Sequence, residues 1–446
     1  MELWMEQILI YGSVFIICGG IIYWYLRRQK NISNTTKEKI ALAKEEGRYE
    51  PVSLHPYIDL NTCIGSAACI SECPEKDILG IVDGKAAAIN ASSCVGHGAC
   101  FHTCPVEAIS LRIGTETRGV ELPHVNQTFE TNIKGIYIAG ELGGMGLIKN
   151  SVEQGKQAVQ NIVKTMRPQE DSRLDLIIIG AGPAGISGAL TAKKHGLSFE
   201  VLEQYTLGGT VYSFPRAKIV MTNPMDLPLY GKVKLYDTSK DELLSIWNEA
   251  LDKNQIRIKE NTKVENIIPQ SDGSFKVNTS AGDTYYCNQV LIAIGRRGTP
   301  RKLGVKGEDL PKVYYRLLEP EQIQNKNIIV VGGGDSAIES AMLLMESNSV
   351  ILSYRKDQFA RIKSKNKERI KQAEANGKIK IIYNSNLSEI EMNKVKIRIK
   401  DEDEEKIFDN DLVYIFAGGE LPTKFLSNAG IEIQKRFGYI MKKHGV

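Results

Sequence analysis

The sequence lacks an excess of charge of either sign. Its 446 residues include 57 Lys and Arg against 53 Asp and Glu, so the formal net charge is only +4. A protein that grips nucleic-acid phosphates carries a basic face, so this balance excludes nucleic acid as the expected partner. With 42% hydrophobic and 25% charged residues, the chain is neither disordered nor a protein with many membrane spans. The length suggests about three domains.

Cysteine is nearly absent outside one short window. Six of the eight cysteines lie between Cys63 and Cys104, and the other two, Cys18 and Cys287, are isolated. A disulfide scaffold spreads its cysteines over the chain, whereas a metal or cluster site gathers them. The distribution therefore predicts a metal or cluster site inside this window.

Long uncharged apolar runs are also absent, apart from one near the start of the chain. The stretch from Ile8 to Leu26 carries no charged residue, and at about 1.5 Å per residue it nearly spans the roughly 30 Å of a bilayer core. Trp24 and Tyr25 stand at its end, where an aromatic belt belongs. The run predicts one membrane-spanning helix.

The residues that flank this run set its expected orientation. Acidic residues precede it and basic residues follow it: Glu2 and Glu6, then Arg27, Arg28 and Lys30. The positive-inside rule places the rest of the chain in the cytoplasm, as a single-pass protein of the inner (cytoplasmic) membrane. A cleaved signal peptide is the alternative, but it requires a basic segment before the run and a small-residue cleavage site after it.

An internal repeat carries the six clustered cysteines. At one constant offset, the first copy with Cys63, Cys69 and Cys73 before Pro74 recurs as Cys94, Cys100 and Cys104 before Pro105. The repeat resembles the two-cluster bacterial ferredoxin, in which the last cysteine of each run ligates the other cluster. A zinc site is disfavoured, because a duplicated arrangement fits two clusters better than one tetrahedral ion.

The repeat departs from the ferredoxin pattern at one position in each copy, where Ser66 and His97 replace cysteine. Carried over residue by residue, the resemblance implies one site with Cys63, Cys69, Cys104 and Ser66, and another with Cys73, Cys94, Cys100 and His97. Three readings stay open: three-iron [3Fe-4S] clusters with an empty corner, [4Fe-4S] clusters completed by Ser or His, or a degenerate module without iron. A neutral imidazole favours the reduced cluster, so the site with His97 is expected to be the higher-potential, terminal electron sink.

A first dinucleotide fingerprint follows the cysteine repeat. Its glycines permit a tight turn and the approach of a pyrophosphate to a helix N-terminus, and its terminal acid suits a ribose diol. The predicted order is a strand over 174–180, the turn glycines Gly180, Gly182 and Gly185, a helix over 186–195, a strand over 199–202, and Glu203.

A second fingerprint lies farther along the chain. It comprises a strand over 327–331, the turn residues Gly332, Gly334 and Ala337, a helix to about residue 347, and a strand over 350–353. No acid ends this last strand; the residues there are Arg355 and Lys356, with Arg361 nearby. Cations at this place favour the 2′-phosphate of NADPH over NADH, and a solvated basic turn is the alternative.

Two nested fingerprints resemble the thioredoxin reductase-like pyridine nucleotide-disulfide oxidoreductases over residues 172–446. The resemblance also rests on Gly208 and Gly209 after the first unit, on residues 293–295, and on residues 417–419. It implies that the first fold binds FAD and that the second, inserted fold binds NADPH. The stretches 214–218 and 313–320 place the chain near the bacillithiol disulfide reductase branch.

One segment of that family is expected at an unusual place. Family members close the FAD domain with a strand, an A-G-D motif and a helix near the C-terminus, and this chain ends shortly after Tyr439. Residues 135–146, with Gly140 and Glu141, and a helix over 150–164 have this form instead. We therefore predict a circular permutation, with Glu141 in place of the family's Asp; a glycine-rich linker is the alternative.

The redox cysteines of the family are missing. No C-x-x-C precedes the second fingerprint, and Ala184 stands where the bacillithiol branch has a cysteine, while Cys287 is expected to be buried and inert. Electrons on FAD should therefore leave through the clusters. We predict a membrane-anchored NAD(P)H-dependent flavoprotein oxidoreductase that serves an unidentified one-electron acceptor, or a donor if electrons flow in reverse. A disulfide reductase and an iron–sulfur redox sensor are the alternatives.

The fold class expected is α/β: two nested Rossmann-like FAD and NAD(P) domains, an α+β ferredoxin-like domain with two clusters, and one transmembrane helix. No catalytic side chain is expected, because hydride transfer between cofactors requires no general acid or base. The oligomeric state stays open between monomer and homodimer. The predicted boundaries are 1–30 for the anchor, 31–54 for a polar linker with a helix around 36–46, 55–114 for the cluster domain, 115–170 for the permuted segment, 171–297 for the FAD domain, 298–416 for the NAD(P)H domain, and 417–446 for the return to the FAD domain.

Overall fold

The computed structural model describes residues 2–444 except 46, 48, 52–53, 76, 95, 97, 145, 167–172, 215–219, 222–223, 236, 297, 360–361, 401 and 403. The chain divides into two compact units. The first consists of residues 1–120 and 437–446, and the second of residues 121–436. Each unit has its own sheets and core.

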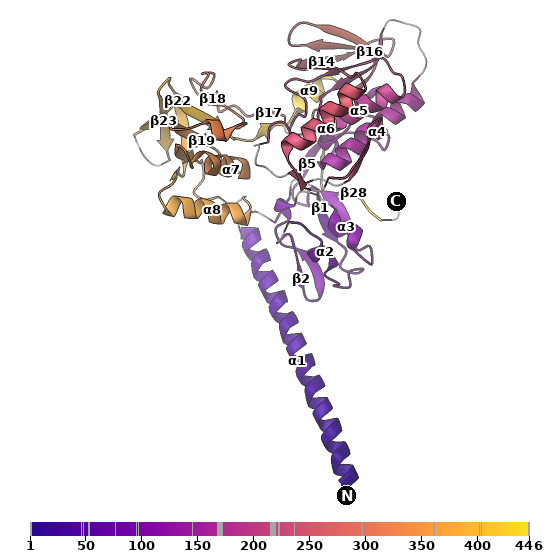
Figure 1. The fold of residues 1–446 in the computed structure, drawn as a ribbon, viewed down its shortest axis with the longest axis vertical. Helices are drawn as coiled ribbons and strands as arrows, with labels where there is room; N and C mark the ends of the chain where they lie inside the picture. The colour runs from indigo at the N-terminus through magenta and orange to yellow at the C-terminus, as the bar shows by residue number, and fades with distance from the viewer. Residues whose placement is uncertain are drawn as a thin grey trace. The chain divides into compact units, whose positions relative to one another are not determined.

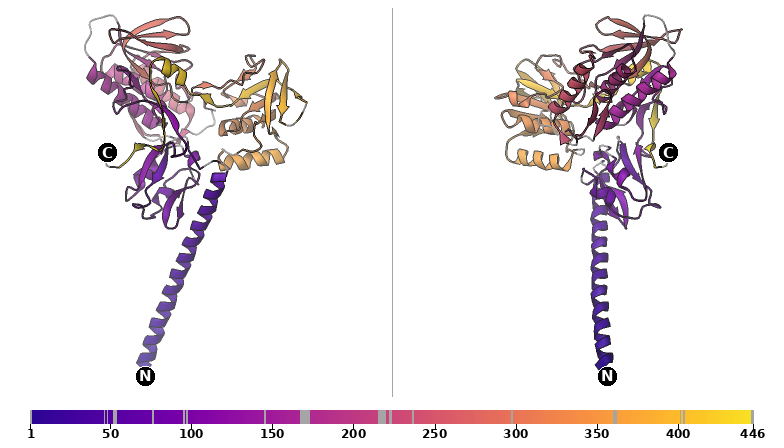
Figure 2. Two further views of the ribbon diagram at one scale, coloured as in Figure 1. Left: turned by 180° about the vertical axis from the view of Figure 1, so that it is seen from behind. Right: turned by 45° about the vertical axis from the view of Figure 1, so that its right-hand side comes forward.

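The first unit begins with one long helix, α1 (Glu2–Glu45), which Figures 1 and 2 show as a continuous rod. Its apolar side chains from Ile8 to Leu26 are exposed, and the helix is long and apolar enough to cross a membrane. The structure confirms the helix predicted around 36–46 as far as Glu45, but as the continuation of α1, which also runs through residues 31–35 where a polar linker was expected. Burial explains the difference: Thr36 and Ala43 are 6% and 0% exposed and pack on the rest of the unit.

The body of the first unit is an antiparallel sheet beside a hairpin and two short helices. The sheet has the order β1 (Leu54–Ile58), β4 (Ile109–Ile113) and β28 (Tyr439–Lys442). The remaining elements are the hairpin of β2 (Leu79–Val82) and β3 (Lys85–Ala88), and the helices α2 (Ala68–Ser71) and α3 (Ala99–Thr103). The expected return of residues 417–446 to the FAD domain is therefore wrong for the last residues, since β28 pairs with β4.

The second unit is built on a seven-stranded sheet. The path runs β13 (Ile258–Lys259), β8 (Phe199–Leu202), β7 (Leu174–Ile179), β16 (Thr284–Ile292), β15 (Phe275–Thr279) and β14 (Val264–Pro269), with β6 (Ile136–Ile138) also paired to β16. The strands β13, β8, β7, β16 and β6 are parallel where they pair. In β7 the run Leu176–Ile179 is almost fully buried, as expected for a parallel strand covered on both faces.

Helices cover this sheet. The main helices are α4 (Ile148–Thr165), α5 (Pro183–Lys194) and α6 (Lys240–Lys253), and α9 (Thr423–Asn428) packs near β14. Helices α4 and α5 lie side by side (Figure 1). The segment predicted as permuted thus lies in this domain: β6 is a strand of its sheet and α4 covers it. That it replaces a segment that relatives carry elsewhere stays a prediction.

A second lobe of the same unit carries the second fingerprint. Its parallel sheet has the order β18 (Val313–Tyr314), β25 (Leu412–Ile415), β19 (Asn327–Val331), β20 (Ser349–Ser353) and β21 (Lys380–Ile382), with helices α7 (Asp335–Leu344) and α8 (Ser364–Ala375). A three-stranded sheet of β22 (Ser385–Ile390), β23 (Lys394–Ile399) and β24 (Lys406–Asp409) flanks it. This nesting of two α/β folds confirms the predicted fold class.

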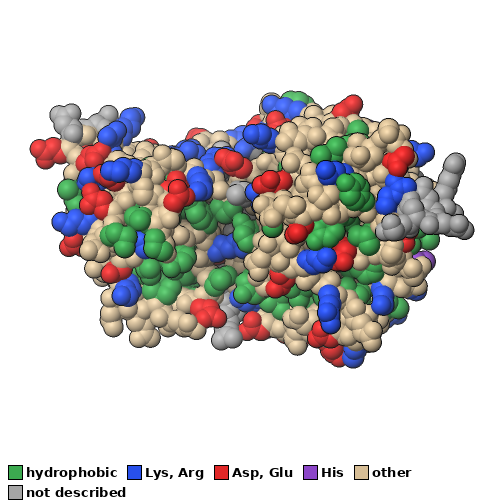
Figure 3. Space-filling model, turned by 90° about the horizontal axis from the view of Figure 1, so that it is seen from above, with side chains coloured by type: hydrophobic (Ala, Val, Ile, Leu, Met, Phe, Trp, Pro, Cys, Tyr) green, Lys and Arg blue, Asp and Glu red, His purple; other side chains and the backbone are tan. Residues whose placement is uncertain are grey.

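Short strand pairs complete the second unit. They are β5 (Val120–Pro123) with β27 (Ile433–Arg436), β9 (Val220–Met221) with β12 (Asp237–Thr238), β10 (Met225–Leu227) with β11 (Gly231–Val233), and β17 (Thr299–Pro300) with β26 (Gly419–Glu420). The chain enters the second lobe after β17 and leaves it before β26, so this strand pair lies where the two lobes are connected. In the view of Figure 3, basic and acidic side chains are interspersed over the face shown.

Candidate functional site

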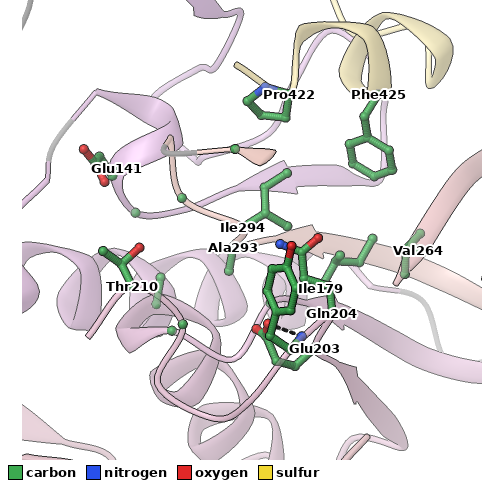
Figure 4. A pocket seen from close by; sticks show the side chains of 18 of the residues that line it. Glu141, Ile179, Glu203, Gln204, Thr210, Val264, Ala293, Ile294, Pro422 and Phe425 are labelled. Atoms are coloured by element: carbon green, nitrogen blue, oxygen red, sulfur yellow. Dashed lines mark hydrogen bonds between the residues drawn. The ribbon is translucent and has the colours of Figure 1, made fainter. Parts of the chain in front are cut away.

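A large cavity lies at the carboxyl ends of the first fold's parallel strands. Its volume is about 650 Å³, within the range of about 300–1,000 Å³ typical of ligand sites. Figure 4 shows Glu203 and Gln204 on one wall and Pro422 and Phe425 on another. The predicted site residues that line it are Gly140, Glu141, Gly180, Gly182, Glu203 and Gly209.

The turn between β7 and α5 is shaped by its glycines. Gly180 has a φ of +103°, and a Cβ there would lie 2.6 Å from the carbonyl oxygen of Ala293. A Cβ on Gly185 would overlap the carbonyl oxygen of Gly180, so this glycine lets the helix approach the strand. Gly182, by contrast, has open space where its Cβ would be. That space is where a pyrophosphate approaches the backbone in such turns.

Two helices begin at the cavity. Pro183 and Ala184 at the start of α5, and Ile148 and Ser151 at the start of α4, line its wall. The N-terminus of a helix carries partial positive charge and free N–H groups, which stabilise a bound anion. The segment predicted to be permuted therefore supplies the second of two helix ends suited to a diphosphate.

Glu203 is fixed by the backbone around it. Its carboxylate accepts hydrogen bonds from Ala181 N at 2.8 Å and from Tyr205 N at 2.9 Å, and the side chain is 5% exposed. These bonds hold the acid at the end of β8, where the fingerprint places it. Four features thus fit a dinucleotide such as FAD: the open glycine turn, the two helix ends, the cavity volume and the position of Glu203.

The other predicted residues of this domain have distinct positions. The N–H of Gly140 donates to Gln154 Oε1 of α4 at 2.8 Å, which ties the end of β6 to its helix. Burial lowers the pKa of the Arg296 guanidinium, and the charge of Glu141 opposes this shift. Gly208 has a φ of +96° and supports the turn beside the cavity without lining it. Glu141 lines the cavity wall, and its charge acts on the guanidinium of Arg296.

The second fold repeats the turn of the first. Gly332 has a φ of +142°, its added Cβ would lie 2.6 Å from Phe416 O, and Ala337 packs 3.1 Å from that position. Gly334 precedes α7 and has open space where a Cβ would be. Arg355 and Lys356 follow β20 and are exposed, so both are accessible to a phosphate. Arg361 lies outside the described residues.

The cysteine repeat brings its thiols together in the crossed manner expected. Cys63, Cys69, Cys104 and Ser66 line one small cavity of the first unit. Burial raises the pKa of Cys69, and the neighbouring charges of Cys63 and Cys104 raise it further. Backbone N–H groups point at the sulfurs, with Ala86 N 3.4 Å from Cys63 Sγ and Ala108 N 3.2 Å from Cys104 Sγ. Such donors stabilise thiolates that hold a cluster.

The other three thiols form a second group. Burial raises the pKa of Cys100 to about 12, and the neighbouring charges of Cys94 and Cys73 add to the shift. Burial also raises the pKa of Cys94 to about 11, and Gly96 N donates to its sulfur at 3.4 Å. His97, the expected fourth residue, lies outside the described residues. The three cysteines therefore fit a cluster on this side as well.

Within the described part of the chain, no three Cys, His, Asp or Glu side chains stand close enough to hold a single metal ion. One zinc ion holds its sulfurs at about 2.3 Å and so draws them tightly together. A cluster of several irons spaces its thiolates farther apart. The crossed grouping of the two sets agrees with the resemblance to ferredoxins.

Some residues at the first cavity, and one beside the cysteines of the cluster domain, were not predicted from the sequence. Arg316 of the second lobe lies 4.0 Å over the ring of Tyr205, and both line the cavity. Phe425 of α9 forms part of the wall, and Lys85 donates a hydrogen bond to Cys63 O in the cluster domain. Of these residues, only Tyr205 could have been found from the sequence, because it stands two residues after Glu203, the acid of the fingerprint. The others depend on contacts between distant segments.

Comparisons with known proteins agree with this geometry. The chain is 31% identical to a ferredoxin–NADP reductase of Ignicoccus hospitalis over 48% of its length and 66% of that protein. It is 28% identical to bacilliredoxin reductase of Bacillus subtilis, over 59% of the chain and 82% of that protein. Among solved structures, bacillithiol disulfide reductase from Staphylococcus aureus superimposes with a TM-score of 0.50 at 25% identity, covering 59% of this chain and 82% of that one.

Two family matches cover the cysteine repeat and most of the second unit. Residues 55–105 match the 4Fe-4S dicluster domain, and residues 177–443 match a family of flavin-dependent enzymes. The second match covers more than half of the chain and includes both fingerprints. The chain therefore belongs to the pyridine nucleotide-disulphide oxidoreductases and carries a 4Fe-4S domain ahead of them.

Proposed function

We propose that this protein is a membrane-anchored, NADPH-dependent flavoprotein oxidoreductase that exchanges electrons, through its two cluster sites, with a one-electron partner at the cytoplasmic membrane. When bound, FAD converts the two-electron chemistry of NADPH into single-electron steps that iron–sulfur clusters can carry. The direction of electron flow depends on the reduction potential of the partner. The same residues would serve the reverse reaction, in which the partner donates electrons.

One observation carries this proposal: the second unit has no thiol available for disulfide chemistry. Its only cysteine is Cys287, which is 0% exposed inside β16. Burial raises the pKa of this thiol to about 12, so the reactive thiolate is absent at neutral pH. A disulfide reductase of the kind named by two of the relatives needs an accessible thiol, whereas this chain places six cysteines in its 4Fe-4S domain.

The other similar protein supports the same conclusion. Its name pairs NADP with ferredoxin, and this chain carries a ferredoxin-like domain on the same polypeptide. The residues of the chain then have simple roles. The helix ends of α4 and α5 bind the diphosphate of FAD, Glu203 binds its ribose, and Arg355 with Lys356 binds the 2′-phosphate of NADPH. Arg361 is assigned to the same phosphate.

Membrane anchoring rests on α1. Its exposed apolar stretch from Ile8 to Leu26 has no protein partner among the described residues, and Arg27, Arg28 and Lys30 follow it. A bilayer is the solvent that such a surface requires. By the positive-inside rule, these basic residues place the end of the span, and the domains that follow it, on the cytoplasmic side. Replacing Ile16 and Ile17 with Lys should move the protein from alkali-washed membranes into the soluble fraction.

Steady-state kinetics test the enzyme function. The detergent-solubilised protein should oxidise many equivalents of NADPH when a one-electron acceptor such as ferricyanide is supplied. A redox sensor would oxidise one stoichiometric amount and stop. Turnover with glutathione disulfide or another disulfide as the sole acceptor would contradict the proposal. A Cys287→Ala variant is the matched control and should keep full activity with ferricyanide.

A further inference from the structure

The anchor helix and the cluster domain of the first unit are joined rigidly. Ser33 Oγ donates to Asp83 Oδ1 at 3.0 Å and accepts from Asp83 N at 3.0 Å, and Lys37 Nζ lies 2.8 Å from Asp83 Oδ2. One and a half turns farther along α1, Lys39 Nζ lies 2.7 Å from Asp77 Oδ1. Because Thr36 is buried between these contacts, α1 has a fixed register on the domain.

This register places one end of the domain beside the bilayer. Ser33 follows the last apolar residue of the span, Leu26, by two turns, which is about 10 Å along the helix. The headgroup layer on each side of a bilayer is about 5–8 Å thick, from the difference between total and core thickness. The turn at Asp83 therefore lies close to the headgroup surface. The contact at Asp77 lies about 9 Å farther along the helix, away from the span.

The first cysteine site is attached to that same turn. A Cβ on Gly65 would overlap the carbonyl oxygen of Gly84, so the loop that follows Cys63 lies directly against the turn. Lys85 donates to Cys63 O, and Ala86 N donates to Cys63 Sγ at 3.4 Å. Cys63 is thus linked through three successive residues to the point where α1 leaves the bilayer.

The second cysteine site is attached to the more distant contact. Cys73 Sγ bonds to Glu75 O, two residues before Asp77, and Asp77 pairs with Lys39. Figure 1 agrees with this order: within the first unit, β2 lies nearer the N-terminal stretch of α1 than α3, the helix that contains Cys100. The two sites are therefore stacked along the helix axis at different heights above the span.

We infer that the site of Cys63, Cys69, Cys104 and Ser66 is the membrane-side terminus of the relay. This inference rests on the proposed anchoring by α1 and adds which of the two sites meets the partner. It departs from the sequence-based expectation that the site of His97 is the terminal electron sink. Each NADPH supplies two electrons, and they leave this site one at a time to reduce two equivalents of a one-electron acceptor held in the membrane. Leu60 and Ile64 on either side of Cys63 are 59% and 63% exposed, as suits a surface that rests on lipid.

A distance measurement in a bilayer tests the order of the sites without using activity. The reduced protein is placed in nanodiscs with and without nickel-chelating lipid headgroups, and the EPR relaxation of each cluster is recorded. Dipolar relaxation by nickel falls steeply with distance, so the signal of the first site should be enhanced severalfold more than that of the second. The Ser66→Cys and Cys100→Ser variants assign the two signals, each changing one site.

A helix insertion gives an independent measurement. Seven residues that continue the helix, inserted between Lys30 and Asn31, raise the domain by about 10 Å with almost the same rotation. The nickel enhancement at the first site should fall to the level of the second, while NADPH–ferricyanide turnover stays unchanged. The same seven residues inserted ahead of Ile8 are the matched control and should change neither quantity.

The outcomes separate this inference from the proposed function. A protein that does not enter nanodiscs would overturn the anchoring and the inference together. A protein that enters them, but shows equal enhancement of both signals or stronger enhancement at the site of Cys94 and Cys100, would overturn the inference alone. Stronger enhancement at the first site, lost only with the insertion after Lys30, is the expected result.

Discussion

The close contact of α4 with α5 makes Gly155 the most informative residue to change. A Cβ on Gly155 would overlap the carbonyl oxygen of Ala184 and lie 2.9 Å from its carbonyl carbon. Both obstacles are backbone atoms in the first turn of α5, where it packs on the middle of α4, so the helices must separate to admit an alanine. Overpacking of this kind costs about 1–3 kcal/mol. Against a total stability of about 5–15 kcal/mol, Gly155→Ala should visibly lower the resistance of the second unit to denaturant.

The same change should weaken flavin binding, because the start of α4 lines the dinucleotide cavity and Ala184 lines it on the opposite helix. Urea titration followed by flavin fluorescence should show a lower unfolding midpoint for the variant. The flavin-free protein, followed by a probe other than the flavin, should show a lower midpoint as well. Gly143→Ala is the matched control from the same segment. Its Cβ would stand 4.0 Å from Ile138, an ordinary contact, so its free energy of unfolding should stay within about 0.5 kcal/mol of that of the wild type.

An unchanged midpoint for Gly155→Ala would refute the packing of α4 on α5. The segment before residue 167 would then be a linker rather than part of the FAD domain. A shift in both variants would point to a general sensitivity of the segment instead of the specific overlap with Ala184.

Four further outcomes can be measured. Arg355→Ala should lower the preference for NADPH over NADH about tenfold or more, because a charge-assisted hydrogen bond of roughly 1.5–3 kcal/mol to the 2′-phosphate is lost. Steady-state kinetics with both nucleotides measure this preference, and equal losses of activity with both would mean that the arginine is structural. Burial raises the pKa of Glu308, but hydrogen bonds from Leu303 N, Gly304 N and the Tyr315 hydroxyl outweigh it and hold the pKa below its usual value of 4.5. Its stabilisation is therefore present above pH 4.5 and lost as the pH falls through the lowered pKa; the unfolding midpoint of Glu308→Gln should lack this acid-side loss. Chelation of iron should leave flavin bound, since the glycine turns lie outside the cysteine repeat, and release of flavin on chelation would argue against separate sites. Redox titration with EPR should show that His97→Cys lowers the potential of its cluster, whereas an unchanged potential and spectrum would mean that the imidazole is not a ligand.

The two fingerprints could be predicted because each is local. Gly180, Gly185 and Glu203 act within one strand–turn–helix–strand unit, so their spacing alone carries the geometry. The crossed grouping of the cysteines came from the repeat together with the ferredoxin resemblance, and the positions of Cys69 and Cys100 agree with it. The strand and helix of 136–165 were recognised for the same reason, as one more local pattern of a known form.

The elements that were missed depend on partners far away in the chain. The part of α1 over residues 31–35 was expected to be a polar linker, because the buried residues on this side, Ser33, Thr36 and Ala43, are few and give no clear period. The strand β28 is short and largely exposed, and its partner β4 lies over three hundred residues earlier, so no spacing rule finds it. The stacking of Arg316 on Tyr205 joins two lobes, which no local pattern encodes.

The position of β28 has a consequence for biogenesis. The sheet of the first unit receives its third strand only when the residues after Arg436 have been synthesised, long after α1 has emerged from the ribosome. His444 then stacks on Phe101 at 3.7 Å between ring centroids, beside Cys100. The cluster domain therefore lacks this strand while both dinucleotide folds are translated. The segment that packs on Phe101, the residue after Cys100, is thus synthesised after both other strands of this sheet.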